Sequence, residues 1–93
     1  MSIRDALKLR NWRGQLPDGT AVELRRPSVL DLIEALEVSA KTPERVQAWM
    51  VLRHLVENGQ SVFESVDEVL ASDALVVQRI AQMAEALYSE GRD

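Results

Sequence analysis

Residues 16–35, LPDGTAVELRRPSVLDLIEA, contain the features that decide the fold. Residues 17–19, PDG, suit a tight turn, because proline presets the first central position, aspartate suits the second, and glycine adopts the left-handed backbone that follows. Residues 20–26 then alternate, with Val22 and Leu24 on one face. A turn followed by an alternating segment predicts a β-hairpin.

Pro27 and Ser28 end the strand pattern and begin a helix. Ser28 is a favourable N-cap, and Asp31 lies three residues later, where its carboxylate can bond back to the backbone and meets the positive end of the helix dipole. The pattern predicts a first helix over residues 29–40. Apolar residues follow at helical spacing: Val29, Leu32, Ile33 and Leu36.

On the N-terminal side of the turn, residues 6–16 alternate imperfectly, with Leu7 and Leu9 in phase, and they predict the first strand of the hairpin. Trp12 falls out of phase with these leucines, on the face that carries basic side chains. Two interpretations stay open for Trp12: it is exposed for binding, or it pairs across the strands of the hairpin. The hairpin is placed within residues 1–26.

On the C-terminal side, Thr42 and Pro43 signal the start of a second helix, and Asn58 with Gly59 signals its end. Apolar side chains cover more than half of the circumference of this helix, which is typical of a central helix. These apolar residues are Val46, Trp49, Met50, Leu52, Leu55 and Val56.

One short helical turn is expected over residues 65–70, with Ser65 as its cap and Glu68 three residues later. Ser72 or Asp73 then caps the last helix. The helical part is placed at residues 28–90, and residues 91–93 are expected to fray. The predicted fold class is α+β, an N-terminal β-hairpin followed by a bundle of three to four helices, with residues 1–93 forming a single domain.

Composition excludes several classes of protein. The 93 residues contain no cysteine, which removes disulfides and thiolate metal sites. The longest unbroken apolar run, residues 48–52, is too short to span a membrane. The first residues have no apolar stretch that could serve as a secretion signal. These observations predict a small soluble intracellular domain with no membrane partner.

Charge is unevenly distributed along the chain. Residues 1–26 carry six basic and three acidic side chains, a net charge of +3, whereas residues 27–93 carry five basic and twelve acidic side chains, a net charge of −7. The acidic body disfavours nucleic acid as a partner. A nucleic-acid-binding regulator remains an alternative, and it predicts steeply salt-dependent DNA binding. Its phosphate contacts would be Arg4, Lys8, Arg10, Arg13, Arg25 and Arg26.

The residues that carry chemistry are sparse. His54 is the sole histidine, and one histidine without cysteine cannot form a zinc site, so a structural or a surface-exposed position is favoured for it over a functional role. The serines lack the nucleophile-elbow pattern, and the four glycines are too scattered for a phosphate-binding loop. We therefore expect no catalytic residue, no metal and no cofactor, and a protein that is not an enzyme.

Surface and shape remain as the basis of function. The second helix has more apolar side chains than one neighbouring layer can cover, which makes Trp49, Met50 and Leu52, together with Trp12, candidate partner-binding residues. The alternative is that the first and last helices sandwich the second helix and cover these side chains.

Residues 16–35 resemble the opening of the small tail assembly chaperones of tailed bacteriophages, in particular the group associated with P2-like and Mu-like contractile tails. The shared features are the size, a hairpin with a glycine turn, a basic-Pro-Ser/Thr junction, a helix that begins with an Asp and an acid-Ala pair, and a helical remainder. The residues that carry this resemblance are Gly19, Arg26, Pro27, Ser28, Asp31, Glu34 and Ala35.

The resemblance implies a phage or prophage protein that binds the long tape measure protein in the cytoplasm of the bacterial host and is absent from the mature virion. It implies that the client stays soluble while tail tube subunits polymerise around it, and that a longer frameshifted product recruits the tail tube protein. Many weak sites on one long client make self-association or arrayed binding expected. The rival expectation is a small virion structural protein, a head-tail connector or tail completion subunit, which would remain in purified particles.

Overall fold

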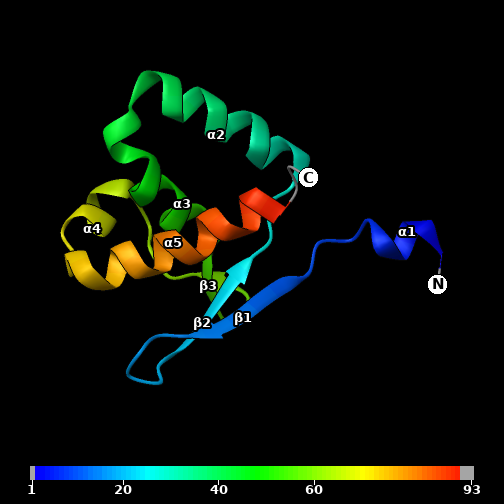
Figure 1. The fold of residues 1–93 in the computed structure, drawn as a ribbon, viewed down its shortest axis with the longest axis horizontal. Coiled ribbons are helices and arrows are strands. Elements are labelled where there is room, and N and C mark those ends of the chain that lie inside the picture. The colour runs from blue at the N-terminus through cyan, green and yellow to red at the C-terminus, as the bar shows by residue number, and fades with distance from the viewer. Residues whose placement is uncertain (1, 91–93) are drawn as a thin grey trace.

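The computed structural model describes residues 2–90 and has an α+β fold, as the sequence predicts. Figure 1 shows α2, α3, α4 and α5 grouped together beside the sheet, with α1 at the far end of a projecting segment. The elements in chain order are α1 (Ile3–Ala6), β1 (Asn11–Gln15), β2 (Ala21–Arg25), α2 (Val29–Lys41), the 3₁₀ helix η1 (Pro43–Arg45), α3 (Val46–His54), β3 (Leu55–Glu57), β4 (Gln60–Ser61), α4 (Val66–Leu70) and α5 (Ala74–Glu90).

The predicted hairpin is confirmed as the antiparallel pair β1 and β2, in which Trp12 lies opposite Leu24. Its turn is closed by the Gly19 amide donating to the Leu16 carbonyl at 2.9 Å, and Gly19 adopts a φ of 90°. The Thr20 amide donates to Asp18 Oδ1 at 2.9 Å, and this bond lowers the pKa of the Asp18 carboxyl. The PDG segment therefore forms the tight turn that the sequence predicts.

The sheet extends beyond the hairpin, which the sequence interpretation missed. The second helix was expected to continue through Leu55 and Val56, but α3 ends at His54 and these two residues pair with β2, with Leu24 opposite Leu55. Asn58 and Gly59 have φ values of 54° and 80°, so they form the hairpin turn between β3 and β4 rather than a helix cap. The order of the four strands within residues 2–90 is β1-β2-β3-β4.

The N-terminal strand is shorter than expected. The prediction of a strand over residues 6–16 is wrong in its first half, because β1 begins at Asn11 and Ile3–Ala6 form the single-turn helix α1. The partner strand β2 ends just before Pro27 and offers residues 6–10 nothing to pair with beyond one bond from the Arg26 amide to the Arg10 carbonyl at 3.4 Å. Leu7 and Leu9 are exposed as a result.

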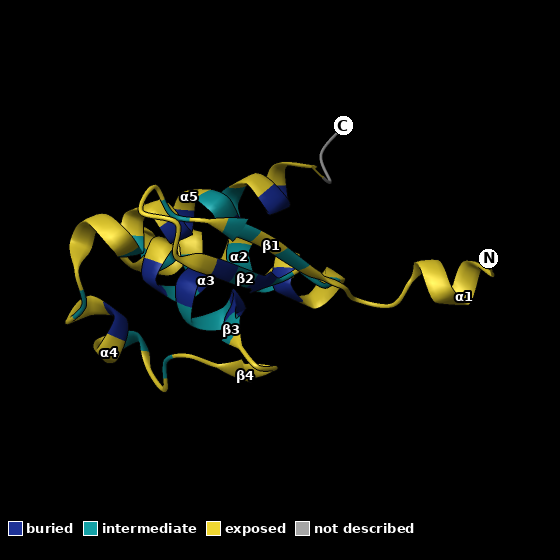
Figure 2. Cartoon of the chain, turned by 90° about the horizontal axis from the view of Figure 1, so that it is seen from below, coloured by how far each residue is buried: buried dark blue, intermediate teal, exposed yellow. Residues whose placement is uncertain are grey.

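The core lies between α3, α5 and the inner face of the sheet, and α3 is central, as the sequence predicts. Figure 2 shows buried residues in β2, α3 and α5, while α1 and the segment after it are exposed. Aliphatic side chains make up most of this core. Its buried apolar residues are Val22, Leu24, Ala48, Met50, Val51, Leu55, Val69, Ile80, Ala81, Ala84, Leu87 and Tyr88.

The two C-terminal helices begin where capping residues predict. The Ser65 hydroxyl accepts from the Glu68 amide at 3.2 Å at the start of α4, and Asp73 accepts from the Leu75 amide at 2.9 Å at the start of α5. The tail predicted to fray, residues 91–93, lies outside the described residues. Among residues 2–90, no helix combines the length and the apolar character needed to cross a membrane.

Candidate functional site

The junction between the sheet and α2 is built by a reciprocal capping box, as the sequence predicts. The Ser28 hydroxyl accepts from the Asp31 amide at 3.1 Å, and Asp31 Oδ2 accepts from the Ser28 amide at 2.8 Å. Two of the free N–H groups at the start of α2 are satisfied in this way. The cap fixes where α2 begins and turns the Asp31 carboxylate toward the body of the protein.

Asp31 is the single buried residue of α2, and its side chain is 1% exposed. Its Oδ1 accepts from Arg53 Nε of α3 at 2.8 Å, and its Oδ2 lies 3.2 Å from an Arg25 guanidinium nitrogen of β2. Arg53 also pairs with Glu34 at 2.9 Å. An ionised carboxylate thus connects β2, α2 and α3, and α2 is held to the body by charge.

The surroundings of Asp31 favour its ionised form. Burial by itself raises the pKa of a carboxyl, but the bond from the Ser28 amide and the Arg53 and Arg25 guanidinium groups outweigh it and lower the pKa of Asp31 below its usual value. Asp31 therefore remains a carboxylate at neutral pH and can accept from all of its donors.

A second buried hydrogen-bond network starts at the backbone of Arg25 and runs through His54 to Tyr88. His54 Nδ1 lies 2.7 Å from the Arg25 carbonyl oxygen, which can only accept, so Nδ1 carries the proton and Nε2 accepts from the Tyr88 hydroxyl. Burial is the main cause that lowers the pKa of His54, and burial likewise raises the pKa of Tyr88 above its usual range. His54 is neutral and fully buried, so of the two positions that the sequence favours it takes the structural one and not the surface-exposed one.

The anchoring of α2 through Asp31 leaves its apolar side chains facing outward. Helical spacing of apolar residues ordinarily marks the face that packs on the core. In α2 Asp31 is turned inward instead, beside the half-buried Glu34, Ala35 and Val38, and the remaining large apolar side chains are 41–76% exposed. These residues, which we call the α2 face, are Val29, Leu30, Leu32, Ile33 and Leu36.

A groove of about 670 Å³ runs beside the α2 face, between α2, α3 and α5. Leu32 and Leu36 form one wall, and the buried Met50 and Tyr88 lie at its base. Glu85 adds an acidic group to the opposite wall. The flexible thioether of Met50 suits a surface that adapts to different apolar side chains.

The sequence-predicted binding residues are distributed differently. Trp49 and Leu52 are half-buried and pack against the core, and Arg53 lies 5.8 Å from the centre of the Trp49 ring. Trp12 is half-buried against the core and lies over Gly14, where an added Cβ would come within 2.3 Å of the Trp12 ring. Met50 alone among the four lines the groove beside α2.

The residues of the family resemblance act mainly as structural elements. Gly19 forms the turn, Ser28 and Asp31 form the cap, and Glu34 pairs with Arg53. Ala35 is partly buried against the core and lines the groove, whereas Pro27 is half-buried and Arg26 is exposed. Of these residues, Ser28, Asp31 and Glu34 therefore help to set the orientation of α2.

Sequence reasoning missed the partners of Asp31 and His54. Arg53 lies 22 residues from Asp31 in the chain, and Tyr88 lies 34 residues from His54. No local spacing connects residues so far apart. The available signal was an acidic residue directly between apolar neighbours in α2, at Leu30 and Leu32.

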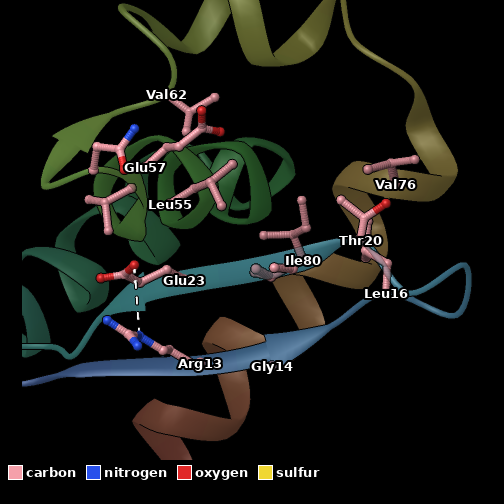
Figure 3. A pocket seen from close by; sticks show the side chains of 14 residues that line it. Arg13, Gly14, Leu16, Thr20, Glu23, Leu55, Glu57, Val62, Val76 and Ile80 are labelled. Atoms are coloured by element: carbon pink, nitrogen blue, oxygen red, sulfur yellow. Dashed lines mark ion pairs between the residues drawn. The ribbon is translucent and has the colours of Figure 1, made fainter.

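A second pocket of about 550 Å³ lies between the hairpin, β3 and the start of α5. Figure 3 shows Arg13 and Glu23 facing each other along one side, and their side chains are 3.9 Å apart. Leu55 and Ile80 contribute apolar lining. The pocket combines an apolar floor with one ion pair along its side.

Within residues 2–90, no three His, Cys, Asp or Glu side chains are arranged to hold a metal ion. Comparison with protein-family models, with curated proteins and with solved structures gives no match for this chain. The described residues combine three features: a helix with exposed apolar side chains, a groove beside it, and a buried ionic anchor beneath it.

Proposed function

We propose that the protein is a non-enzymatic phage or prophage tail assembly chaperone whose α2 face binds apolar segments of the tape measure protein. The observation that carries the proposal is the α2 face, where the anchor at Asp31 holds the large apolar side chains of one helix toward solvent. The resemblance of residues 16–35 to this class of chaperones supports the same conclusion.

The dimensions of α2 suit a helical client. Its 13 residues span about 20 Å at about 1.5 Å per residue. An amphipathic helix of similar length, with apolar residues at positions i, i+3, i+4 and i+7, can lie along such a face and insert side chains into the groove above Met50. Exposed contiguous apolar surface of this kind is typical of binding sites in small proteins.

Charge suits the task as well. Residues 27–93 have a net charge of −7, so a complex between this body and an apolar client keeps a strongly charged exterior. Net charge opposes association between complexes and favours their solubility. The protein would thus cover the apolar face of its client while preventing the aggregation of the covered segments.

The test is co-production of the full chain with the tape measure protein of a related prophage, with the soluble fraction of the client as the readout. We expect the Ile33→Asp, Leu36→Asp double variant to lose client capture, because both side chains are exposed and the fold does not depend on them. Leu75→Asp is the matched control, since Leu75 is 68% exposed at the start of α5 and does not line the groove. Trp49→Asp is unsuitable, because Trp49 packs against the core.

A folded double variant that keeps the client soluble as well as the wild type does would refute the proposal. Recovery of the wild-type protein in purified phage particles would favour the virion structural alternative instead. Circular dichroism of each variant shows that loss of capture is not caused by unfolding.

A further inference from the structure

The N-terminal arm, residues 2–10, is a second apolar element without a partner. Every residue from Ser2 to Arg10 is exposed, and the large apolar side chains of the arm are 50–76% exposed. A one-turn helix such as α1 gains too little from its own hydrogen bonds to persist alone in water, so it needs a surface to pack on. The apolar residues of the arm are Ile3, Leu7 and Leu9.

The arm and the α2 face have complementary charge. The arm carries three basic side chains against one acidic side chain, for a net charge of +2. Two carboxylates border the α2 face, Glu37 exposed on α2 and Glu85 lining the groove, and Lys41 in the last turn of α2 is the one basic residue of this helix. Basic side chains that flank an apolar contact would therefore meet carboxylates if the arm lay along this face.

In the observed conformation the arm reaches only the start of α2 of its own chain and leaves the rest of the α2 face uncovered. Leu7 and Leu9 lie beside Pro27 and Val29, where α2 begins. From there α2 runs toward the helical body, while the arm runs in the opposite direction (Figure 1). A second copy related by a twofold axis near this junction could receive the arm on its own α2 face, and its arm would return the contact.

We propose that two copies of this chain associate by exchanging N-terminal arms, with Ile3, Leu7 and Leu9 of one copy packed on the α2 face of the other. The exchange covers both apolar elements at once and pairs the positive arm with the negative body. It shares the α2 face with the proposed function, so a client helix and the arm compete for the same surface. The dimer is then the client-free state of the protein.

Sedimentation equilibrium of the full chain over a range of concentrations tests the exchange. We expect a reversible dimer for the wild type and for the Leu75→Asp control. The arm variant Ile3→Asp, Leu7→Asp and the face variant Leu32→Asp, Leu36→Asp should each raise the dimer dissociation constant by roughly tenfold or more, since each buried Leu or Ile contributes enough burial free energy for about that factor. The arm variant should fold normally, because its substituted residues are exposed.

Mixing the two variants separates arm exchange from other modes of association. The arm variant has an intact α2 face and the face variant has an intact arm, so the mixture should regain a heterodimer held by one exchanged arm. A wild-type chain that is monomeric at all concentrations would overturn the inference. So would an arm variant that dimerises as tightly as the wild type, because the α2 faces would then pack on each other directly.

Client capture by the arm variant keeps the two proposals distinguishable. A monomeric arm variant that still captures the tape measure protein supports both the exchange and the proposed function. A face variant that is monomeric but still captures the client refutes the proposed function and leaves the arm exchange standing.

Discussion

Replacing Asp31 by Asn tests whether charge holds α2 to the body. The carboxylate accepts from the Arg53 side chain through Oδ1 and from the Ser28 amide through Oδ2, at 2.8 Å in each case. An Asn amide has one acceptor oxygen, so its NH₂ group must face one of these donors. The substitution removes the charge, at least one strong hydrogen bond and the ion pair with Arg25, while the shape of the side chain is kept.

The magnitude follows from the burial of the partners. Removing one member of a fully buried ion pair costs about 3–5 kcal/mol, because the other charge is left uncompensated. The Arg25 and Arg53 side chains are 31% and 33% exposed, so both can regain water. We expect Asp31→Asn to lower the free energy of unfolding by about 2–3 kcal/mol, which corresponds to a fall in Tm on the order of 10–20 °C in a domain of this size.

The assay is urea denaturation followed by circular dichroism, with Glu34→Gln as the matched control. Glu34 also pairs with Arg53, but both side chains are about a third exposed, so its loss should cost less than about 1 kcal/mol.

The pKa of Asp31 is lowered in the folded state, so the stabilisation is present above the unfolded value of 3.8 and is lost as the pH falls below it. The difference between wild type and Asp31→Asn should therefore shrink in acid. Equal stability of the two proteins at neutral pH would refute the ionic anchor.

Three further predictions concern the core. Gly14→Ala would place a Cβ 2.3 Å from the Trp12 ring, so the ring must move; we expect a loss of about 1–3 kcal/mol in stability and a changed tryptophan emission, and an unaltered spectrum would contradict the packing. Tyr88→Phe leaves the buried His54 Nε2 without its donor and should cost about 1–3 kcal/mol, as measured by denaturation. Because burial lowers the pKa of His54 in the folded state, stability should fall as the pH drops below the unfolded value of 6.5; an NMR titration of this sole histidine that gave a folded pKa at or above 6.5 would count against the buried neutral ring.

Local chemistry in the sequence predicts the parts of the fold that depend on near neighbours. The PDG turn, the Ser28 cap and the Ser65 cap are confirmed, since each needs only residues within about four positions. The end of the second helix was misplaced because Asn58 and Gly59 suit both a helix terminus and a two-residue hairpin turn. Pairing of Leu55 with Leu24 of β2, 31 positions earlier in the chain, selects the hairpin.

The candidate site likewise has a part that local sequence determines and a part that only tertiary contacts determine. The sequence by itself determined that residues 29–40 form a capped helix with apolar side chains at helical spacing, because capping and periodicity are local properties. Which side of that helix faces the protein was decided by the tertiary structure alone. Arg25 and Arg53 converge on Asp31 from β2 and α3, and a buried carboxylate must be paired with such donors to avoid a large desolvation cost. Satisfying Asp31 turns its side of α2 inward, and the residues of the α2 face are left exposed.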